Sequence, residues 1–189
     1  MATVRKLRAD AQRNRDAILD AAREVFEAEG VLASLDGIAL RAGVGNATLY
    51  RNFPTRDDLL AAVIASSFDE ALAEADELSR TLPPREALTE WLVLVTWRLR
   101  IWHDLPYCLA TALHNAESPM KPTCDPLLER TADLLDAAKA AGDLAGPVAA
   151  GEVYELVLAL SWAVDRFDDD EAAARRRVAM ATAGLFIPR

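Results

Sequence analysis

The sequence has few cysteines and no long apolar run, and each shortage excludes a class of protein. Its two cysteines, Cys108 and Cys124, cannot form the disulfide framework of a small secreted protein, and they make no C-x-x-C pair. Apolar stretches such as residues 91–95 fall far short of the roughly 18 residues that a membrane-spanning helix needs. No apolar core follows the basic N-terminal residues, so no secretory signal is predicted. We therefore expect a cytoplasmic protein with reduced cysteines and no membrane partner.

Motifs for metal or catalytic chemistry are also missing. Four side chains offer thiol or imidazole ligands, but their intervals of 5, 6 and 10 residues match no ligand spacing used for zinc or copper. These residues are His103, Cys108, His114 and Cys124. The sequence has neither a glycine-rich phosphate loop nor a nucleophile elbow. We therefore predict no metal, no cofactor and no catalytic residue.

Helical periodicity dominates the sequence, and alternation of period two is almost absent. Because apolar residues recur at helical spacing throughout, we predict an all-α protein. The first helix is expected at about 14–29, with Gly30 as its stop. Residues 118–126, which include three prolines, are expected to form a loop. The remaining helices are expected at about 35–41, 46–52, 56–78, 85–103, 106–115, 125–141, 148–166 and 170–186.

The net charge of −9 argues against a nucleic-acid partner until its distribution is considered. Residues 1–56 hold 9 basic and 7 acidic side chains, whereas residues 57–189 hold 12 and 23. The acidity therefore belongs to the second part. The first part opens with a basic arm, which we expect to contact phosphates or the minor groove, although a solvated flexible tail is the simpler interpretation. The arm contains Arg5, Lys6, Arg8, Arg13 and Arg15.

Two short helices joined by a glycine-containing turn follow the first helix, which is the order of a helix-turn-helix. A generic helical bundle can show the same order. The composition of the second short helix, 46–52, favours DNA binding, since Leu49 is its one clearly apolar core residue. The other side chains include amide, hydroxyl, phenol and guanidinium groups, which bind phosphates and base edges.

These residues resemble the TetR family of bacterial transcriptional regulators. The resemblance covers about residues 15–63. The matching residues stand at the family's spacings and are 18–22, Phe26, Gly30, 38–39, 42–44, 48–50, Phe53 and 59–60.

The resemblance implies a set of DNA contacts. Thr48 and Tyr50 would contact the DNA backbone, and the helix start at Gly45, Asn46 and Ala47 would lie against base edges. Arg56 takes the place of the family's usual phosphate-binding lysine. The full set of predicted DNA-binding residues is Arg5, Lys6, Arg8, Ser34, Arg41, Gly45, Asn46, Ala47, Thr48, Tyr50, Arg51 and Arg56, of which Ser34 and Arg41 would hold the flanking backbone.

The resemblance also implies a two-part architecture. A helix-turn-helix head, residues 1–56, would be joined by a long helix to a helical body, residues 57–189, that binds a small molecule and dimerises through its last two helices. Two apolar stripes are the candidates for that dimer interface, although an intramolecular core would show the same pattern. The stripes are Val153, Leu156, Val157, Leu160 and Val164, and Val178, Thr182, Leu185 and Phe186, with Ala149, Ala159 and Ala163 permitting close helix approach.

The predicted helix at 85–103 is apolar almost all round and should be central in the body. It suggests an aromatic-lined pocket for a small molecule, with core packing as the alternative for each residue. The candidate ligand-binding residues are Trp91, Val95, Leu99, Trp102, Tyr107, His114 and Trp162.

We therefore predict a homodimeric regulator that binds palindromic double-stranded operator DNA and is released by an unknown small-molecule effector. A helical small-molecule-binding protein or enzyme that retains a non-functional head is the alternative from another class. Activation of transcription instead of repression also stays open.

Overall fold

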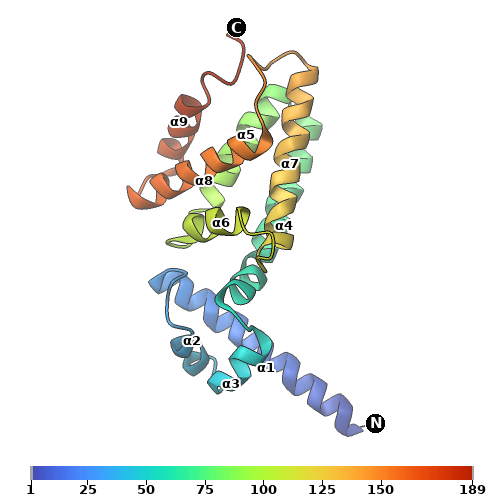
Figure 1. Ribbon diagram of the computed structural model, residues 1–189, viewed down its shortest axis with the longest axis vertical. Helices are drawn as coiled ribbons and strands as arrows, with labels where there is room; N and C mark the ends of the chain where they lie inside the picture. Colours follow the sequence, from blue (N-terminus) through green and yellow to red (C-terminus); the bar gives the residue numbers. More distant parts are fainter. Residues whose placement is uncertain (1, 189) are drawn as a thin grey trace.

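The chain forms two helical bodies, one above the other in Figure 1. A computed structural model describes residues 2–188, with side chains from residue 9 onward. Within residues 2–188 there are nine helices and no strand, which confirms the predicted all-α class. The helices are α1 (Ala2–Glu29), α2 (Leu35–Arg41), α3 (Asn46–Asn52), α4 (Arg56–Thr81), α5 (Pro84–Arg98), α6 (Leu105–Leu113), α7 (Lys121–Ala140), α8 (Ala150–Arg166) and α9 (Glu171–Ala181).

Helices α1, α2 and α3 form the lower body in Figure 1, called the head below. One face of each helix supplies the head's core, where Phe26, Ile38 and Leu49 are fully buried. Gly30 and Gly43 end α1 and α2 at φ values of +83° and +67°, a left-handed conformation that favours glycine. The predicted stop at Gly30 is therefore confirmed, Gly43 ends α2 in the same way, and the three helices have the predicted helix-turn-helix order.

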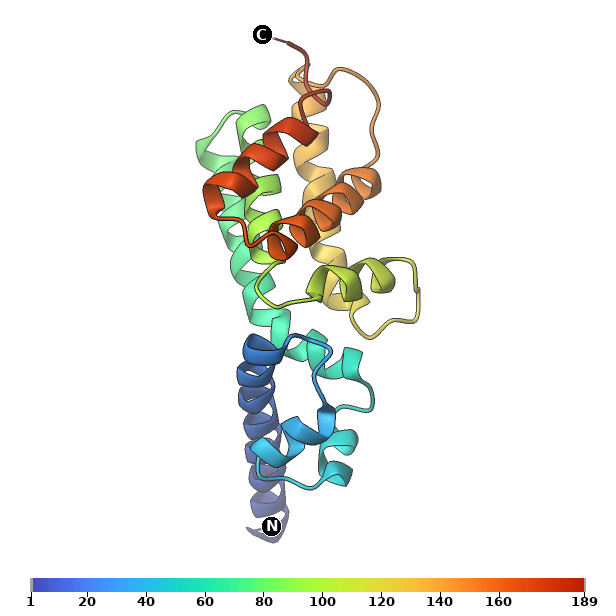
Figure 2. The ribbon, with the colours of Figure 1, turned by 90° about the vertical axis from the view of Figure 1, so that its left-hand side faces the viewer.

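Helix α4 begins in the head and continues into the upper body, called the body below (Figures 1 and 2). A capping box of Thr55 and Asp58 defines its start. Thr55 Oγ1 accepts a hydrogen bond from Asp58 N, and Asp58 Oδ2 accepts one from Thr55 N at 2.9 Å. These bonds satisfy two backbone N–H groups at the helix start, so α4 begins at a defined residue next to the head.

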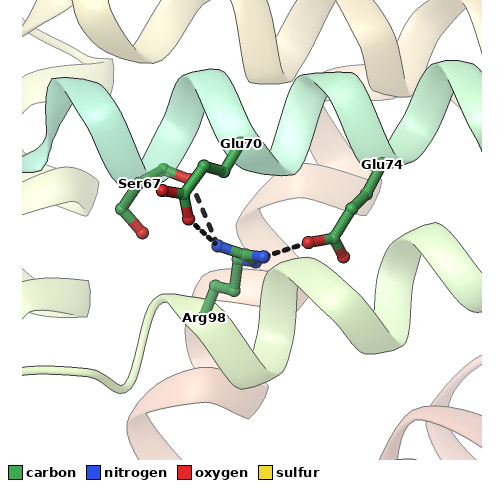
Figure 3. Close-up of polar contacts among 4 residues, drawn as sticks. All are labelled: Ser67, Glu70, Glu74 and Arg98. Atoms are coloured by element: carbon green, nitrogen blue, oxygen red, sulfur yellow. Dashed lines mark hydrogen bonds and ion pairs between the residues drawn. The ribbon is translucent and has the colours of Figure 1, made fainter.

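The end of α5 is braced against the middle of α4 by one arginine (Figure 3). Arg98 forms ion pairs with Glu70 and Glu74, and its Nη1 donates to Ser67 O at 3.5 Å. The Glu70 and Glu74 side chains are 70% and 50% exposed, so water screens these pairs and each contributes about 0–1 kcal/mol. The pairs add to the packing of α4 against α5 and α7, which holds the connecting helix on the body.

Helix α5 is the central helix of the body and packs against α4, α7, α8 and α9. Its buried Trp91 donates Nε1–H to Thr131 Oγ1 at 2.9 Å, and Thr131 donates in turn to Leu127 O. This chain satisfies a polar group that burial would otherwise leave unpaired. Helix α6 lies on the side of the body that faces the head (Figure 2).

The predicted start of α1 is wrong. The helix begins at Ala2 instead of about residue 14, so the basic arm is a continuation of α1. The reason is local, because residues 2–13 contain no glycine or proline and are mostly good helix formers.

Three other predicted helix ends are also wrong. Helix α5 ends at Arg98 instead of residue 103, and residues 99–104 form a turn in which Asp104 has a φ of 65°. Helix α7 begins at Lys121 and includes part of the predicted proline loop, because Pro122 lies in the first turn, where no N–H is needed. Helix α9 ends at Ala181, since the residues after it hydrogen-bond to residues 143–145.

Candidate nucleic-acid interface and a groove in the body

Helix α3 presents a polar face away from the head's core. Leu49 is fully buried and anchors the helix, whereas Asn46, Ala47, Tyr50 and Arg51 are exposed. Tyr50 is 45% exposed, and no hydrogen bond of its phenol is found among the described residues. Thr48 lies half-buried between the two faces. The structure thus brings the predicted α3 residues together on one accessible surface.

One side-chain hydrogen bond ties α3 to α2, and a second lies within α3 itself. Asn46 Nδ2 donates to Asp36 Oδ1 of α2 at 2.9 Å, and Asn52 Nδ2 donates to Thr48 O at 2.8 Å. Gly45 is the N-cap of α3 and, having no side chain, cannot make a side-chain capping bond. The helix is therefore oriented by its contact with α2 and by the buried Leu49.

Ser34 and Arg41, the predicted flanking contacts, lie at the two ends of α2. Ser34 Oγ accepts a hydrogen bond from Gly37 N at 3.4 Å and caps the helix. Arg41 Nε pairs with Glu24 Oε2 of α1 at 2.6 Å. Both members of that pair are more than half exposed, so the pair contributes about 0–1 kcal/mol and leaves Arg41 able to exchange partners.

Arg56 has a structural role that the sequence pattern did not indicate. Its Nη1 donates to Val31 O at 2.7 Å and to Ala33 O at 2.6 Å, so one guanidinium nitrogen holds the loop between α1 and α2. No local sequence signal reveals these contacts, because they join residues 23 and 25 positions apart. Whether Arg56 also binds a phosphate stays a prediction.

The side chains of Arg5, Lys6 and Arg8 lie outside the described residues. Of the arm's two described arginines, Arg13 pairs with Asp10 and Arg15 stacks over the Phe53 ring, 4.5 Å from its centroid. Arg15 therefore packs against the head, and Arg13 stays on its surface.

The head touches the body through a few close contacts. Val31 N donates to His103 O at 3.1 Å, and the rings of Phe26 and Trp102 lie 5.8 Å apart. His103 also reaches α8, where its Nδ1 lies 2.8 Å from Asp165 Oδ2. His103 therefore joins the head to α8.

The seven predicted ligand-binding residues separate into two groups. Trp91, Val95, Leu99 and Trp102 are buried in the core, which is the alternative that their pattern left open. The other three lie together on a surface groove of about 250 Å³ between α6 and α8, called the α6–α8 groove below. Its lining residues are Pro106, Tyr107, Ala110, Leu113, His114, Glu155, Leu158, Ala159 and Trp162.

The α6–α8 groove is mostly apolar and has one polar end. There, His114 Nε2 lies 3.5 Å from Glu155 Oε1, and both side chains are more than half exposed. Tyr107 of α6 and Trp162 of α8 both line the groove and are 63% and 47% exposed. A mostly apolar concavity with a few polar groups is the usual chemistry of a small-molecule site.

The predicted dimer stripes point mostly into the body, contrary to expectation. Val153, Val157, Val164, Val178 and Phe186 are all buried within the single chain. The helical spacing of these apolar residues is therefore explained by the packing of α8 and α9 within the body.

The four thiol and imidazole residues considered for metal binding do not form a site. Among the described residues, no group of three or more His, Cys, Asp or Glu side chains is placed to hold a metal ion. Burial, with nearby acidic groups adding to it, raises the pKa of Cys108 to about 11 and that of Cys124 to about 12. Thiols with such pKa values are protonated at neutral pH and are poor ligands.

Among residues 2–188, no helix is both long enough and apolar enough to cross a bilayer.

Known proteins match both parts of the chain. Residues 83–187 match the C-terminal domain of SbtR-like transcriptional regulators, and residues 18–63 match the bacterial regulatory proteins of the tetR family. The crystal structure of a TetR transcriptional regulator from Streptomyces coelicolor is 30% identical in sequence, with a TM-score of 0.59. The alignment covers 93% of this chain and 99% of that one.

Relatives known from sequence match the head. The HTH-type transcriptional regulator SrpR of Pseudomonas putida is 48% identical over 63 residues, which are 33% of this chain and 30% of SrpR. The HTH-type transcriptional repressor LfrR of Mycolicibacterium smegmatis is 41% identical over 76 residues, 40% of each chain. The matched segment thus spans less than half the length of these relatives.

Proposed function

The chain belongs to the TetR family of bacterial transcriptional regulators, and from that premise we propose that it is a repressor that works as a homodimer. In this proposal, α3 of each subunit enters the major groove of an operator, and a small molecule in the α6–α8 groove releases the DNA. The families and relatives that match are transcriptional regulators, which confirms the prediction that the protein is not an enzyme.

The polar outer face of α3 is the observation that carries the DNA-binding part. Within the described part of the chain no group pairs with the Tyr50 phenol, which suits a phosphate oxygen, and half-buried Thr48 lies at the edge of the same helix. Among the described residues Asn46 uses one N–H, on Asp36, which leaves its second N–H and its carbonyl for a base edge. The proposed base contacts come from Gly45, Asn46 and Ala47, and the proposed phosphate contacts from Ser34, Arg41, Thr48, Tyr50, Arg51, Arg56 and the arm residues Arg5, Lys6 and Arg8.

A homodimer would place two such heads on one duplex. Two α3 helices related by a two-fold axis would read half-sites about 34–36 Å apart, or a multiple of that spacing, so the operator would be palindromic. The acidic body would stay away from the phosphates, since residues 57–189 carry the excess of negative charge.

The outer faces of α8 and α9 are the proposed dimer interface, in place of the buried stripes. Large apolar side chains are exposed there, with Leu156 at 36%, Phe167 at 64% and Met180 at 75%. Small residues lie between them, which lets helices approach closely. These small residues are Ala163, Ala172, Ala179 and Ala183, of which Ala163 was a candidate from sequence; Ala159, another candidate, lines the α6–α8 groove instead.

His103 supports a route from the α6–α8 groove to the head. It precedes α6 by two residues, its Nδ1 lies against Asp165 near the end of α8, and its carbonyl oxygen accepts from Val31 of the head. A ligand that separates α6 from α8 would therefore move the residue on which the head rests. The ligand can release DNA only if it binds more tightly to the arrangement of the heads that does not bind DNA. The factor by which the ligand weakens DNA binding must then equal the factor by which DNA weakens ligand binding.

A direct binding measurement tests the proposal. Full-length protein at nanomolar concentration should retard a DNA fragment from upstream of its own gene in moderate salt, and Tyr50→Ala should abolish the shift. Leu40→Ala is a matched control, because Leu40 is 83% exposed on α2 and is absent from the proposed DNA contacts. A folded dimer that binds no such fragment would favour the alternative, a small-molecule-binding protein with a non-functional head. A promoter–reporter assay separates repression from activation.

A further inference from the structure

The start of α3 carries one side chain that can recognise a base by hydrogen bonds. Gly45 and Ala47 have no polar side-chain atoms, so Asn46 is the one residue of these three whose side chain donates or accepts. Asn46 is exposed, and its Nδ2 donates to Asp36 Oδ1 of α2 at 2.9 Å. The base that Asn46 can recognise therefore depends on the groups that Asp36 leaves free.

Asp36 determines which way the Asn46 amide points. A carboxylate can only accept hydrogen bonds, so the NH₂ group of the amide, and not its carbonyl oxygen, lies toward Asp36. This bond uses one of the two amide hydrogens. Within the described part of the chain it is the one side-chain bond of Asn46, so one donor and one acceptor remain for DNA.

Adenine is the base whose major-groove edge complements this remaining pair. It presents one acceptor, N7, beside one donor, the N6 amino group. Guanine presents two acceptors, cytosine presents a donor alone, and thymine presents an acceptor alone, so none of these bases pairs with both groups of the amide. The negative charge of Asp36 also opposes guanine, because two acceptor atoms give its edge a negative potential.

We infer that Asn46 recognises one adenine in each half-site of the operator and that Asp36 is the positioning residue that selects this base. Asp36 acts through Asn46, since it holds the amide in the orientation that pairs with N6 and N7 of adenine. The inference rests on the proposed function, in which α3 enters the major groove. Asp36 also lies in the first turn of α2, where a carboxylate stabilises the helix, so the test must separate base preference from stability.

Selection from a library of random DNA duplexes by the full-length protein gives the preferred half-site. We expect one position of each half-site to be an A·T pair that is favoured about tenfold or more over the other pairs in titrations of single-base variants. Asn46→Ala should remove the preference at that position and keep the others. Replacing the adenine by 7-deazaadenine, which lacks the N7 acceptor, should weaken binding of the unaltered protein about fivefold and leave that of Asn46→Ala unchanged.

The selection also distinguishes failure of this inference from failure of the proposed function. If the protein selects a palindrome in which Asn46→Ala affects no position, or affects a pair other than A·T, the inference is wrong and the proposed function stands. If it selects no sequence at all, the proposed function is wrong.

Asp36→Asn tests the positioning role. The new amide can accept from Asn46 or donate to it, so the Asn46 amide is no longer held in one orientation. The preference for A·T should fall about threefold or more, whereas the overall affinity for DNA should not fall, because the loss of a negative charge reduces repulsion from the phosphates. A destabilised head would instead bind every sequence more weakly, and a thermal melt of the variant measures its stability.

Glu27→Gln is the matched control. It removes another exposed carboxylate from the head, on α1 and outside the proposed DNA contacts, and it should leave the base preference unchanged. If Asp36→Asn keeps the full preference for A·T, or if Glu27→Gln lowers that preference as much, Asp36 does not position Asn46.

Exchanging the two residues should change the base that is recognised. Asp36→Asn combined with Asn46→Asp keeps the net charge of the head. The amide at position 36 can then donate to the carboxylate at position 46, whose other oxygen can only accept. Such an acceptor matches the N4 amino group of cytosine and is repelled by N7 of adenine, so the preferred pair should change from A·T to C·G. An unchanged preference for A·T in the double variant would overturn the inference.

Discussion

Gly30 lies against His103 at the junction of head and body, closely enough that a Cβ on Gly30 would stand 3.2 Å from both the Cβ and the carbonyl oxygen of His103. The next residue, Val31, donates its N–H to the same carbonyl at 3.1 Å. The glycine is thus needed twice, once for its φ of +83° and once for the space it leaves.

Gly30→Ala should therefore destabilise the protein more than left-handed strain alone explains. Gly142→Ala is a matched control, because Gly142 follows α7 with a φ of +75° and a Cβ there would meet nothing within 4 Å. We expect Gly142→Ala to cost about 1–2 kcal/mol from strain, and Gly30→Ala to cost at least about 1 kcal/mol more from the contact with His103. Urea denaturation of the two variants measures the difference. Equal losses of unfolding free energy in the two variants would mean that the contact between residue 30 and His103 adds no destabilisation.

Replacing Arg56 should lower the stability of the protein, whereas replacing Arg51 should weaken its binding to DNA. Arg56→Met leaves Val31 O and Ala33 O without their donor, so the free energy of unfolding should fall by about 1–3 kcal/mol. Arg51 is exposed on α3, so Arg51→Ala should leave stability unchanged. It should instead weaken DNA binding and reduce the slope of log K against log salt by about 1. If Arg56→Met changes only the salt slope, its bonds to the loop contribute nothing to stability.

Most of the fold could be predicted because its signals are local. The stops at Gly30 and Gly43, the capping box at Thr55 and the polar face of α3 each depend on residues within one or two helical turns. The residues that join the two bodies could not be predicted in this way. His103 binds Asp165 across 62 positions and Val31 across 72, and nothing in the neighbouring sequence marks either pair.

The limits of apolar patterns explain the other errors. Helix α5 is apolar almost all round, so periodicity could not separate Trp91 in the core from a residue that lines a cavity. The stripes of α8 and α9 gave the same ambiguity, and Val157 and Val178 proved to face inward. Only Tyr107, His114 and Trp162 of the proposed pocket lie together, on one groove.

The basic arm should add affinity without adding specificity. Replacing Arg5, Lys6 and Arg8 by Gln removes three charges from the start of α1. We expect weaker DNA binding and a slope of log K against log salt that is flatter by up to about 3, because phosphate contacts release counterions. The same three changes should leave the ranking of operator sequences unchanged, as measured by competition with mutated half-sites. A changed ranking would mean that the arm contacts base edges.

The proposed dimer interface can be tested with one charge. Ala179→Glu places a carboxylate on the outer face of α9, where Arg175 lies one turn away, so the isolated subunit should keep its stability. At a two-fold interface the carboxylate would be buried beside its copy, and the dimer dissociation constant should rise by about a hundredfold or more. Analytical ultracentrifugation measures it, and operator binding should weaken in parallel. Ala137→Glu, on the exposed face of α7, is the control and should leave the dimer intact. An unchanged dimer in Ala179→Glu would place the interface elsewhere.

Alkaline pH should destabilise the protein through groups buried in the body. Burial raises the pKa of Cys108 to about 11 and of Cys124 to about 12, and it raises the pKa of Tyr154 as well. A cysteine of the unfolded chain titrates near pH 8.5, so above that pH the unfolded state binds fewer protons than the folded state. Stability is therefore fully present below about pH 8.5 and falls as the pH rises toward 11 and 12, because its slope with pH follows the difference in bound protons.

Cys124→Ala isolates one of these groups. The variant should be less stable at every pH because of the space it leaves, but its stability should decline less steeply than that of the unaltered protein between pH 8.5 and 11. Urea denaturation at a series of pH values gives both quantities separately. Parallel curves for the two proteins would show that Cys124 titrates alike in the folded and unfolded chains, and the alkaline loss would then belong to Cys108, Tyr154 or the net charge of the body.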